Sequence, residues 1–530
     1  MAPETLVDPE TDPTATYAVD PARVRRLADR VVCAARPPRM TTRTPMTGAP
    51  LADLPQSTGE DVEVAYQGAR TAARGWARTP LERRAQVFLR FHDLVLEHQA
   101  DLLDLIQLES GKARRDAFEE IADVAMVSRH YARRAAGYLR PHRRAGAYPV
   151  LSQAVELRHP KGVVGLVSPW NYPLTLSITD LIPALIAGNT AVLRPDTGAA
   201  LTALQAVALL DRAGLPEGVL KVVLGDGPTV GQAVLDRADH VCFTGSTPTG
   251  RTVGRAAGER LVGASLELGG KNPMYVADDA DLARAVRVAL RSCFSSAGQL
   301  CVSVERLYLH EGIADAFLAA FVPATAALRL SPDLAYGPDL GSLASARQLD
   351  RVGAHVEDAR AKGARVLTGG RARPDVGPYF YEPTVLADVT PEMDCATQET
   401  FGPVVAVHRV RDDAEAIALA NDSDYGLNAV VCTGSRPRGR AIAAALQTGT
   451  VSVNDGYAAS WGSVGAPMGG MKASGLGRRH GAEGILRFTE VQNVTVQRLL
   501  PVAPVLGMSD ARVADVLTAA LRAMKRLGLR

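Results

Sequence analysis

The sequence predicts an α/β fold with two domains, each built around a mainly parallel sheet. Short β-rich runs alternate with helical stretches from residue 162 onward, and such alternation is typical of βαβ units in a doubly wound parallel sheet. The strand-like runs of this series are residues 162–167, 190–193, 220–224 and 240–244. A second alternating series follows Lys271, with runs at 306–309, 404–407, 429–431 and 450–453. It predicts a second α/β domain.

Helices precede the first sheet, and two strand-like segments fall outside both series. Residues 1–60 are rich in Pro, Thr and Asp, whereas apolar residues recur at helical spacing from Thr58 to Arg140, which predicts helices on a domain face. Residues 154–158 and 488–496 alternate like exposed strands but do not fit a βα rhythm. We expect these two segments to pair in a small protruding sheet used for oligomerisation.

The last segment predicts an amphipathic helix that begins after an N-cap at Ser509-Asp510. Its apolar residues share one face and are Val513, Val516, Leu517, Ala520, Leu521, Met524 and Leu527. The opposite face carries Arg512, Arg522, Lys525 and Arg526. Packing on this protein or on a neighbouring subunit is the first interpretation, and a membrane-surface role for a basic amphipathic helix is the alternative.

Composition narrows the classes of partner. The 530 residues include 47% hydrophobic side chains, enough to bury at least two cores, which argues against a disordered chain. The 59 basic and 57 acidic side chains leave a net charge of +2, so no long-range field favours nucleic acid or an anionic membrane. The first residues are acidic and punctuated by proline, and no run of about 18 apolar residues occurs. We therefore expect small-molecule partners, no transmembrane segment and a cytoplasmic location.

Six cysteines lie at positions 33, 242, 293, 301, 395 and 432. They show neither the CxxC nor the Cys/His spacing of a zinc site or redox dithiol, so we expect no metal site and no disulfide. A small buried hydrophobe is the ordinary interpretation of any one of them. Cys301 differs because a Gly298-Gln299 turn delivers it, and an activated thiolate there suits covalent catalysis on a carbonyl.

Three further segments carry polar groups at chemically useful places. In the segment LELGGK, Glu267 lies within an apolar strand, where burial raises a carboxyl pKa toward that of a general base. In the segment SPWNYP, Asn171 either donates its amide to an oxyanion or caps the following helix. Gly245 and Ser246 join a strand to a helix, a turn that binds phosphate in some proteins and is an ordinary turn in others.

These four segments, together with ETFGP at residues 399–403, resemble the aldehyde dehydrogenase superfamily in order and spacing. The resemblance covers residues 45–495, and its most specific part is the pair ELGGK and GQxC, about thirty residues apart. The segments SPWNYP, GQLCVSVER and APMGGMKASG are most similar to the actinobacterial-type succinate-semialdehyde dehydrogenase group. The resemblance implies NAD(P)-dependent oxidation of an aldehyde, with succinate semialdehyde to succinate as the first candidate reaction.

By this resemblance the thiolate of Cys301 attacks the aldehyde, the amide of Asn171 holds the oxyanion, and water activated by Glu267 hydrolyses the thioester. The implied architecture is a Rossmann-like doubly wound cofactor domain, a second α/β catalytic domain and a small β oligomerisation extension. The expected bounds are 1–150 with 162–268 for the dinucleotide-binding domain, 269–485 for the catalytic domain, 151–161 with 486–497 for the oligomerisation strands, and 498–530 for the amphipathic tail. A homodimer or homotetramer is expected.

The resemblance also implies a cofactor site, with the pyrophosphate at Gly245-Ser246 and the nicotinamide ribose at Glu399. Arg194 is a permanent cation that pairs well with a 2′-phosphate, and Thr197 stands where NAD-preferring members often carry Glu. We therefore expect NADP, with NAD as the alternative. The full set of expected cofactor residues is Trp170, Asn171, Arg194, Pro195, Asp196, Thr197, Gly245, Ser246, Leu268, Glu399 and Phe401.

Three departures from the family pattern bear on proton transfer and substrate. Asp180 stands where many members have a Lys that helps to relay protons. Thr179 and Ser295 stand where the best-known bacterial succinate-semialdehyde type has two arginines that clamp the substrate carboxylate, and Ser303 replaces that type's second Cys. An uncharged aliphatic or aromatic aldehyde is therefore the alternative substrate. An acylating, CoA-dependent enzyme and a non-catalytic protein on the same fold are remoter alternatives, and Glu267 argues against both.

Overall fold

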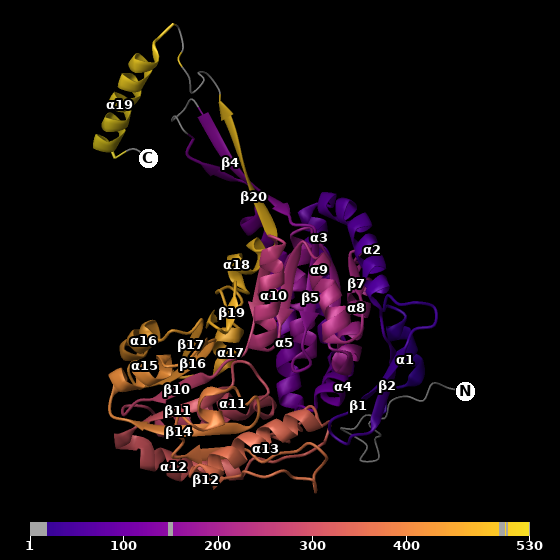
Figure 1. Cartoon of the computed structure of the whole chain (residues 1–530), viewed down its shortest axis with the longest axis vertical. Coiled ribbons are helices and arrows are strands. Elements are labelled where there is room, and N and C mark those ends of the chain that lie inside the picture. The colour runs from indigo at the N-terminus through magenta and orange to yellow at the C-terminus, as the bar shows by residue number, and fades with distance from the viewer. Residues whose placement is uncertain (1–17, 147–151, 498–503, 505–506, 529–530) are drawn as a thin grey trace.

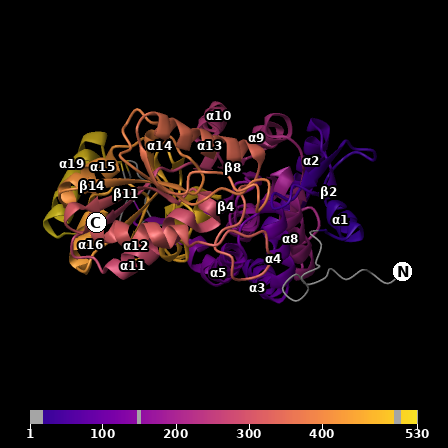
Figure 2. The ribbon, with the colours of Figure 1, turned by 90° about the horizontal axis from the view of Figure 1, so that it is seen from below.

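The computed structural model describes residues 18–146, 152–497, 504 and 507–528, and within them two large sheets lie beside each other while a small third sheet projects as an arm (Figure 1). A view from below shows the same side-by-side arrangement, with the N-terminal elements at one end (Figure 2). Three parts of the predicted architecture lie outside the described residues. They are the two ends of the predicted N-terminal unit (1–17 and 147–150), residue 151 of the predicted oligomerisation strand, and parts of the predicted tail (498–503, 505, 506, 529 and 530).

The first sheet has six strands in the order β19-β9-β8-β5-β6-β7. They are β5 (Val163–Ser168), β6 (Thr190–Pro195), β7 (Leu220–Val222), β8 (His240–Thr244), β9 (Gly263–Glu267) and β19 (Gly475–Leu476). Strands β5 to β9 are parallel and their order reverses between β5 and β8, which confirms the predicted doubly wound sheet. The short β19 pairs antiparallel with β9, although it comes from the segment predicted for the catalytic domain. One segment thus contributes to both units, and the individual domain bounds stay a prediction.

Helices cover both faces of this first sheet. Against one face lie α2 (Gly59–Arg78), α9 (Gln232–Arg237) and α10 (Thr247–Glu259). Against the other lie α6 (Pro173–Ile178), α7 (Leu181–Ile186) and α8 (Ala200–Ala213), with α3 (Leu81–Glu97), α4 (Gln99–Ser110) and α5 (Arg114–Leu139) outside them. Successive strand residues point to opposite faces, so Val163 and Val167 of β5 join one core while Val164 and Leu166 join the other.

The second sheet has seven strands in the order β12-β13-β14-β11-β10-β16-β17, and all but β12 run parallel to their neighbours. They are β10 (Asn272–Val276), β11 (Val304–His310), β12 (Arg365–Thr368), β13 (Thr384–Ala387), β14 (Val404–Val410), β16 (Asn428–Cys432) and β17 (Thr450–Val453). One face packs on α11 (Leu282–Phe294), α12 (Glu311–Ala326) and α13 (Ala346–Ala361), and the other on α15 (Asp413–Asn421) and α16 (Arg436–Ala445). The predicted second α/β unit is confirmed.

The arm consists of β3 (His142–Arg144), β4 (Ser152–Pro160) and β20 (Thr489–Gln497). Strands β4 and β20 pair antiparallel along their whole length, so the two segments predicted to pair do so. Beyond the arm stands the tail helix α19 (Asp510–Arg526), whose N-cap is Ser509 as predicted (Figure 1). None of its described residues is buried. The first interpretation allowed the helix to pack on this protein, and the structure does not show such packing.

Several short elements complete the chain. At the N-terminal end are α1 (Pro21–Ala28) and a hairpin of β1 (Arg39–Arg43) and β2 (Pro50–Pro55), which the sequence did not predict. Near the second sheet are α14 (Asp394–Thr397), α17 (Tyr457–Trp461), β15 (Tyr425–Gly426) and β18 (Met471–Lys472), whereas α18 (Gly481–Leu486) packs on α5 and α7 beside the first sheet. Across the described residues, every helix is too short or too polar to cross a membrane.

Candidate active site

Side chains from both large sheets meet around a cavity of about 160 Å³ at the carboxyl ends of β5, β8 and β9. This is the edge where the strand order reverses and where open α/β sheets bind ligands. Nine residues expected from the sequence line it, and these are Trp170, Asn171, Gly245, Ser246, Glu267, Leu268, Cys301, Glu399 and Phe401. The other four, residues 194–197, lie at the carboxyl end of the neighbouring strand β6 and do not line this cavity.

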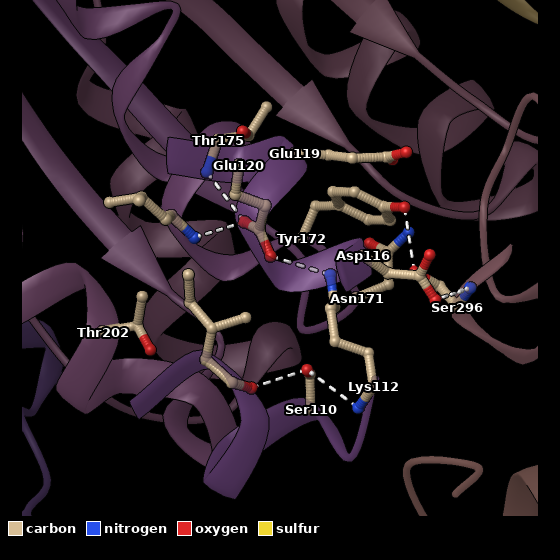
Figure 3. A network of polar contacts seen from close by, with 12 residues as sticks. Ser110, Lys112, Asp116, Glu119, Glu120, Asn171, Tyr172, Thr175, Thr202 and Ser296 are labelled. Carbon is tan, nitrogen blue, oxygen red and sulfur yellow. Dashed lines mark hydrogen bonds and ion pairs between the residues drawn. The ribbon is translucent and has the colours of Figure 1, made fainter. Parts of the chain in front are cut away.

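A strained loop carries Cys301. Beyond α11, Ser296 and Ala297 have positive φ values of 51° and 53°. Side chains other than glycine rarely adopt this conformation, so surrounding contacts must hold it. The backbone N–H of Ser296 donates to Oδ2 of the buried Asp116 at 2.8 Å, and the hydroxyls of Ser296 and Tyr172 lie 2.9 Å apart (Figure 3). The loop thus rests on α5 and on the turn after β5.

Two glycines leave room for the nucleophile and for Glu399. The carbonyl oxygen of Cys301 accepts a hydrogen bond from Nδ2 of Asn272 at 2.8 Å. A Cβ on Gly270 would lie 2.5 Å from that oxygen, and a Cβ on Gly269 would lie 2.6 Å from a carboxylate oxygen of Glu399. A side chain at either position would displace one of these groups, which explains the glycine pair in the segment LELGGK.

The environment of Cys301 disfavours its thiolate. The pKa of the thiol is raised to about 12, first by burial and then by the carboxylates of Glu267 and Glu399, against a lowering effect from Arg479. The resting group is therefore a neutral thiol at pH 7, and attack on a carbonyl needs a neighbouring group that accepts its proton.

Glu267 has the properties of such an acceptor. It is the last residue of β9 and is 7% exposed. Burial raises its pKa to about 7, although Arg479 and Arg487 lower it. Its Oε1 is buried and makes no hydrogen bond with the described residues. A carboxyl group that titrates near neutrality suits a general base.

Asn171 is hydrogen-bonded to the loop that carries the nucleophile. Its Nδ2 donates to the carbonyl oxygen of Gln299 at 3.0 Å, two residues before the thiol. The next helix, α6, is held at its start by Glu120, which accepts the backbone N–H groups of Leu174 at 2.8 Å and Thr175 at 3.0 Å (Figure 3). The amide and the thiol are therefore fixed through adjoining parts of one network.

A buried cation completes this network. Nζ of Lys112 lies 2.7 Å from Oε1 of Glu120 and 3.4 Å from the centre of the Tyr172 ring, and both charged side chains are at most 1% exposed. Sequence reasoning missed Lys112, Asp116 and Glu120, because helical spacing alone does not distinguish buried carboxylates on α5 from a solvated face, and Lys112 lies in the loop before that helix.

The opposite wall of the cavity has features that fit a nicotinamide dinucleotide. Gly245 and Ser246 stand at the N-terminus of α10, where helix N–H groups bind phosphate. The rings of Trp170 and Phe401 meet edge to face, 5.6 Å between centres. Oε1 of Glu399 accepts the backbone N–H of Gly270 at 2.8 Å.

A second buried ion pair fixes the segment that carries Glu399. Nζ of Lys271 lies 2.5 Å from Oε2 of Glu305, and both side chains are at most 3% exposed. Glu305 also accepts the backbone N–H groups of Thr400 at 2.9 Å and Phe401 at 3.0 Å. It thereby connects the LELGGK and ETFGP segments. Glu305 lies in the segment GQLCVSVER, but nothing in the neighbouring sequence indicates that it pairs with Lys271.

Arg194 does not stand free for a 2′-phosphate. Its Nε donates to the carbonyl oxygen of Gly225 at 2.9 Å, Nη2 donates to the same oxygen, and Nη1 lies 3.9 Å from the carboxylate of Asp196. The side chain of Thr197 lies near the same carbonyl. A 2′-phosphate of NADP would therefore have to compete with the carboxylate of Asp196 for the guanidinium of Arg194.

The departure at Asp180 is compensated by cations from distant parts of the chain. Asp180 pairs with Arg479 at 3.0 Å and with Arg487 at 2.5 Å. Although burial raises the pKa of Asp180, the two arginines hold it below its ordinary value. Nη2 of Arg479 also donates to the hydroxyl of Thr179 at 2.6 Å. Arg479 is also the first of the cations that lower the pKa of Glu267, a role that sequence reasoning did not assign.

Comparison with known proteins agrees with this geometry. The aldehyde dehydrogenase family matches residues 33–494. A Mycolicibacterium smegmatis protein with the provisional name succinate-semialdehyde dehydrogenase NADP(+) is 50% identical over 513 residues, which cover 97% of this chain and 99% of that protein. An E. coli NADP-dependent enzyme of known structure is 34% identical over 87% of this chain and 95% of its own, with a TM-score of 0.83. An aldehyde dehydrogenase of Bacillus cereus in complex with NAD+ is 32% identical over 90% and 98%, also with a TM-score of 0.83. The chain therefore belongs to the aldehyde dehydrogenase family.

Proposed function

We propose that this aldehyde dehydrogenase oxidises its substrate to a carboxylic acid through Cys301, with NADP preferred and NAD as the alternative cofactor. One observation carries the proposal. A thiol, a carboxyl group with a pKa near neutrality and an amide donor line the same cavity as a helix N-terminus suited to phosphate.

In the proposed reaction Glu267 accepts the thiol proton of Cys301, and the sulfur attacks the aldehyde carbon. The C–S bond forms as the carbonyl π electrons move to oxygen. The second Nδ2 hydrogen of Asn171, beside the one given to Gln299, donates to this oxyanion together with the backbone N–H of Cys301.

The nicotinamide ring, when bound, supplies the acceptor for the hydride that leaves the former aldehyde carbon. Loss of this hydride leaves that carbon in a thioester with the sulfur of Cys301. Glu267 releases its proton to solvent and then deprotonates water, which attacks the thioester carbon. The C–S bond breaks, the carboxylic acid departs and the sulfur regains a proton. We propose that Gly245 and Ser246 hold the pyrophosphate, that Glu399 holds the nicotinamide ribose, and that residues 194–197 contact the adenine ribose.

For the substrate, the names of relatives favour succinate semialdehyde, since the Mycolicibacterium smegmatis protein at 50% identity carries that name with NADP(+). A second candidate is an aldehyde without a carboxylate. It is favoured by Thr179 and Ser295, because both are buried side chains without charge at the two positions where the clamping arginines were expected.

The test is the initial rate of NADP and NAD reduction by the purified protein, with succinate semialdehyde and with hexanal. Cys301→Ser should abolish both reactions, whereas Cys33→Ser, at a half-buried thiol outside the cavity, should leave them intact. A preference for NAD would contradict the cofactor proposal. Cofactor reduction by the Cys301 variant at the rate of the unmodified protein would contradict the mechanism.

We also propose that the protein works in the cytoplasm as a homodimer or homotetramer joined through the arm. Support comes from β20, which bonds to β4 along one edge and exposes Val491, Val494 and Val496. Exposed apolar residues on an edge strand favour pairing with another chain. Light scattering of the purified protein should give two or four times the chain mass, and Val494→Lys should shift it toward the monomer.

A further inference from the structure

An open groove of about 390 Å³ lies on the surface between the second half of α5 and the loop 462–466 that follows α17. Most of its lining residues are exposed. We call it the arginine groove, because three arginines of α5 line it, and these are Arg129, Arg133 and Arg134. Residues four or five apart on a helix lie on neighbouring parts of its surface, so the three guanidinium groups share one side of α5.

The arginine groove adjoins an inner cavity of about 230 Å³ that leads toward the thiol. Met126 and Gly462 line both spaces. The inner cavity is in turn next to the candidate active site, because Thr175 of α6 lines the inner cavity and the next residue, Leu176, lines the cavity of Cys301. None of the expected cofactor residues lines the groove or the inner cavity. The two spaces therefore form a path from the surface to the side of Cys301 that the cofactor does not occupy.

The positive charge of the arginine groove is not compensated within the chain. No carboxylate lines the groove. Among the residues that the structure describes, Arg129, Arg133 and Arg134 form no ion pair. His130, which also lines the groove, is neutral at pH 7, because burial and then Arg134 lower its pKa. The charge thus comes from guanidinium groups, which stay protonated at any pH at which a protein is folded.

The charges of the inner cavity, by contrast, have partners. Glu119 accepts a hydrogen bond from Nη2 of Arg291 at 2.8 Å and another from the hydroxyl of Tyr457 at 2.7 Å. The second carboxyl group, that of Asp123, has Trp461, Arg479 and Thr175 near enough to lower its pKa. Together the linings of the groove and the inner cavity contain four arginines and two carboxylates. The excess of positive charge on the path therefore lies at its outer end.

We propose that the arginine groove is an entrance that attracts aldehydes with a carboxylate at the end remote from the reacting carbon. A cleft lined by one sign of charge raises the local concentration of the opposite charge and speeds its association, and guanidinium groups pair well with carboxylates. This inference rests on the proposed dehydrogenase activity and favours its first candidate substrate, succinate semialdehyde. It places the selecting cations at the surface rather than at Thr179 and Ser295, where the clamping arginines were expected.

The test compares succinate semialdehyde with uncharged butanal, using the full-length enzyme and saturating NADP. Between about 10 mM and about 150 mM salt, the distance over which exposed charges act falls from about 30 Å to about 8 Å. We therefore expect kcat/KM for succinate semialdehyde to fall about tenfold over this range, while that for butanal stays unchanged. At low salt, Arg129→Gln, Arg133→Gln and Arg134→Gln combined in one variant should raise the KM for succinate semialdehyde about tenfold, leave its kcat unchanged and remove the salt dependence.

Two matched variants separate charge at this place from net charge and from shape. Arg74→Gln, Arg78→Gln and Arg440→Gln together remove the same charge from exposed positions on α2 and α16, and should leave both aldehydes unaffected. Lysine at 129, 133 and 134 keeps the charge and should restore most of the wild-type KM. The inference is overturned if the groove variant keeps the wild-type KM, if it affects both aldehydes alike, or if the control variant has the same effect.

Calorimetric binding of acids at low salt separates this inference from the proposed function. Succinate and butanoate share one carboxylate, and only succinate has a second at the far end. Tighter binding of succinate by wild-type enzyme, lost in the groove variant, supports the entrance even if no aldehyde reduces a cofactor, an outcome that would refute the dehydrogenase activity alone. Equal binding of the two acids by wild-type enzyme counts against the entrance and leaves the dehydrogenase activity standing.

Discussion

Replacing Glu267 by Gln should remove the acid limb of the pH profile. The pKa of Glu267 is about 7 because burial raises it, so its ionised, proton-accepting form predominates above pH 7 and is lost below it. With a pKa near 7, about half of the base is ionised at pH 7 and about a tenth at pH 6. The kcat of wild-type enzyme should therefore rise about tenfold from pH 6 to a plateau near pH 8. Glu267→Gln should lower the plateau by about 10²–10⁴ and flatten the limb.

The assay is steady-state NADPH formation across this pH range with saturating aldehyde and cofactor. Glu399→Gln is the matched control, because burial raises the pKa of Glu399 to about 7 as well. That variant should keep the acid limb in kcat and raise the KM for the cofactor. The reasoning is refuted if Glu267→Gln keeps the limb, or if the limb disappears in Glu399→Gln instead.

Three other substitutions test the surroundings of the site. Asp196→Asn removes the carboxylate beside Arg194 and should lower the KM for NADP about tenfold relative to that for NAD, as measured by initial rates. Gly270→Ala would place a Cβ 2.5 Å from the carbonyl oxygen of Cys301 and should lower kcat about a hundredfold in a protein whose circular dichroism is unchanged. Lys271→Met leaves Glu305 buried without its cation and should cost about 3–5 kcal/mol in urea unfolding; a loss below about 1 kcal/mol would show that the pair is not needed.

Most of the parallel strands could be predicted because they are largely buried and so consist mainly of consecutive apolar residues, but β10 and β13 were not among the predicted runs. Strand β5 is buried at all six positions, and its range was predicted to within a residue. The hairpin of β1 and β2 could not be predicted, because β1 is mostly exposed and polar and β2 begins and ends with proline. Neither strand shows the alternation by which a single sequence indicates a strand.

The residues of the candidate site could be predicted where local sequence carries the signal. Cys301 and Glu267 each lie within three residues of a glycine, and a Cβ on Gly298 or Gly269 would come within 2.6 Å of a neighbouring atom. Their supports could not be predicted, because each contact joins distant segments. Glu305 bonds to residues 95 and 96 positions away, and Arg479 meets Asp180 across 299 positions. The hydrogen bond from Arg194 to the carbonyl oxygen of Gly225, 31 positions away, could not be predicted for the same reason.

The two left-handed residues before Cys301 make the enzyme vulnerable at positions that no substrate touches. Ser296 and Ala297 each hold a backbone conformation that costs about 1–3 kcal/mol, so the loop would relax if its anchors were lost. One of those anchors, Asp116, belongs to α5, which packs on α6 and α7 outside the first sheet. Substitution of Asp116 on α5 should therefore misplace the nucleophile as directly as a change beside the thiol itself.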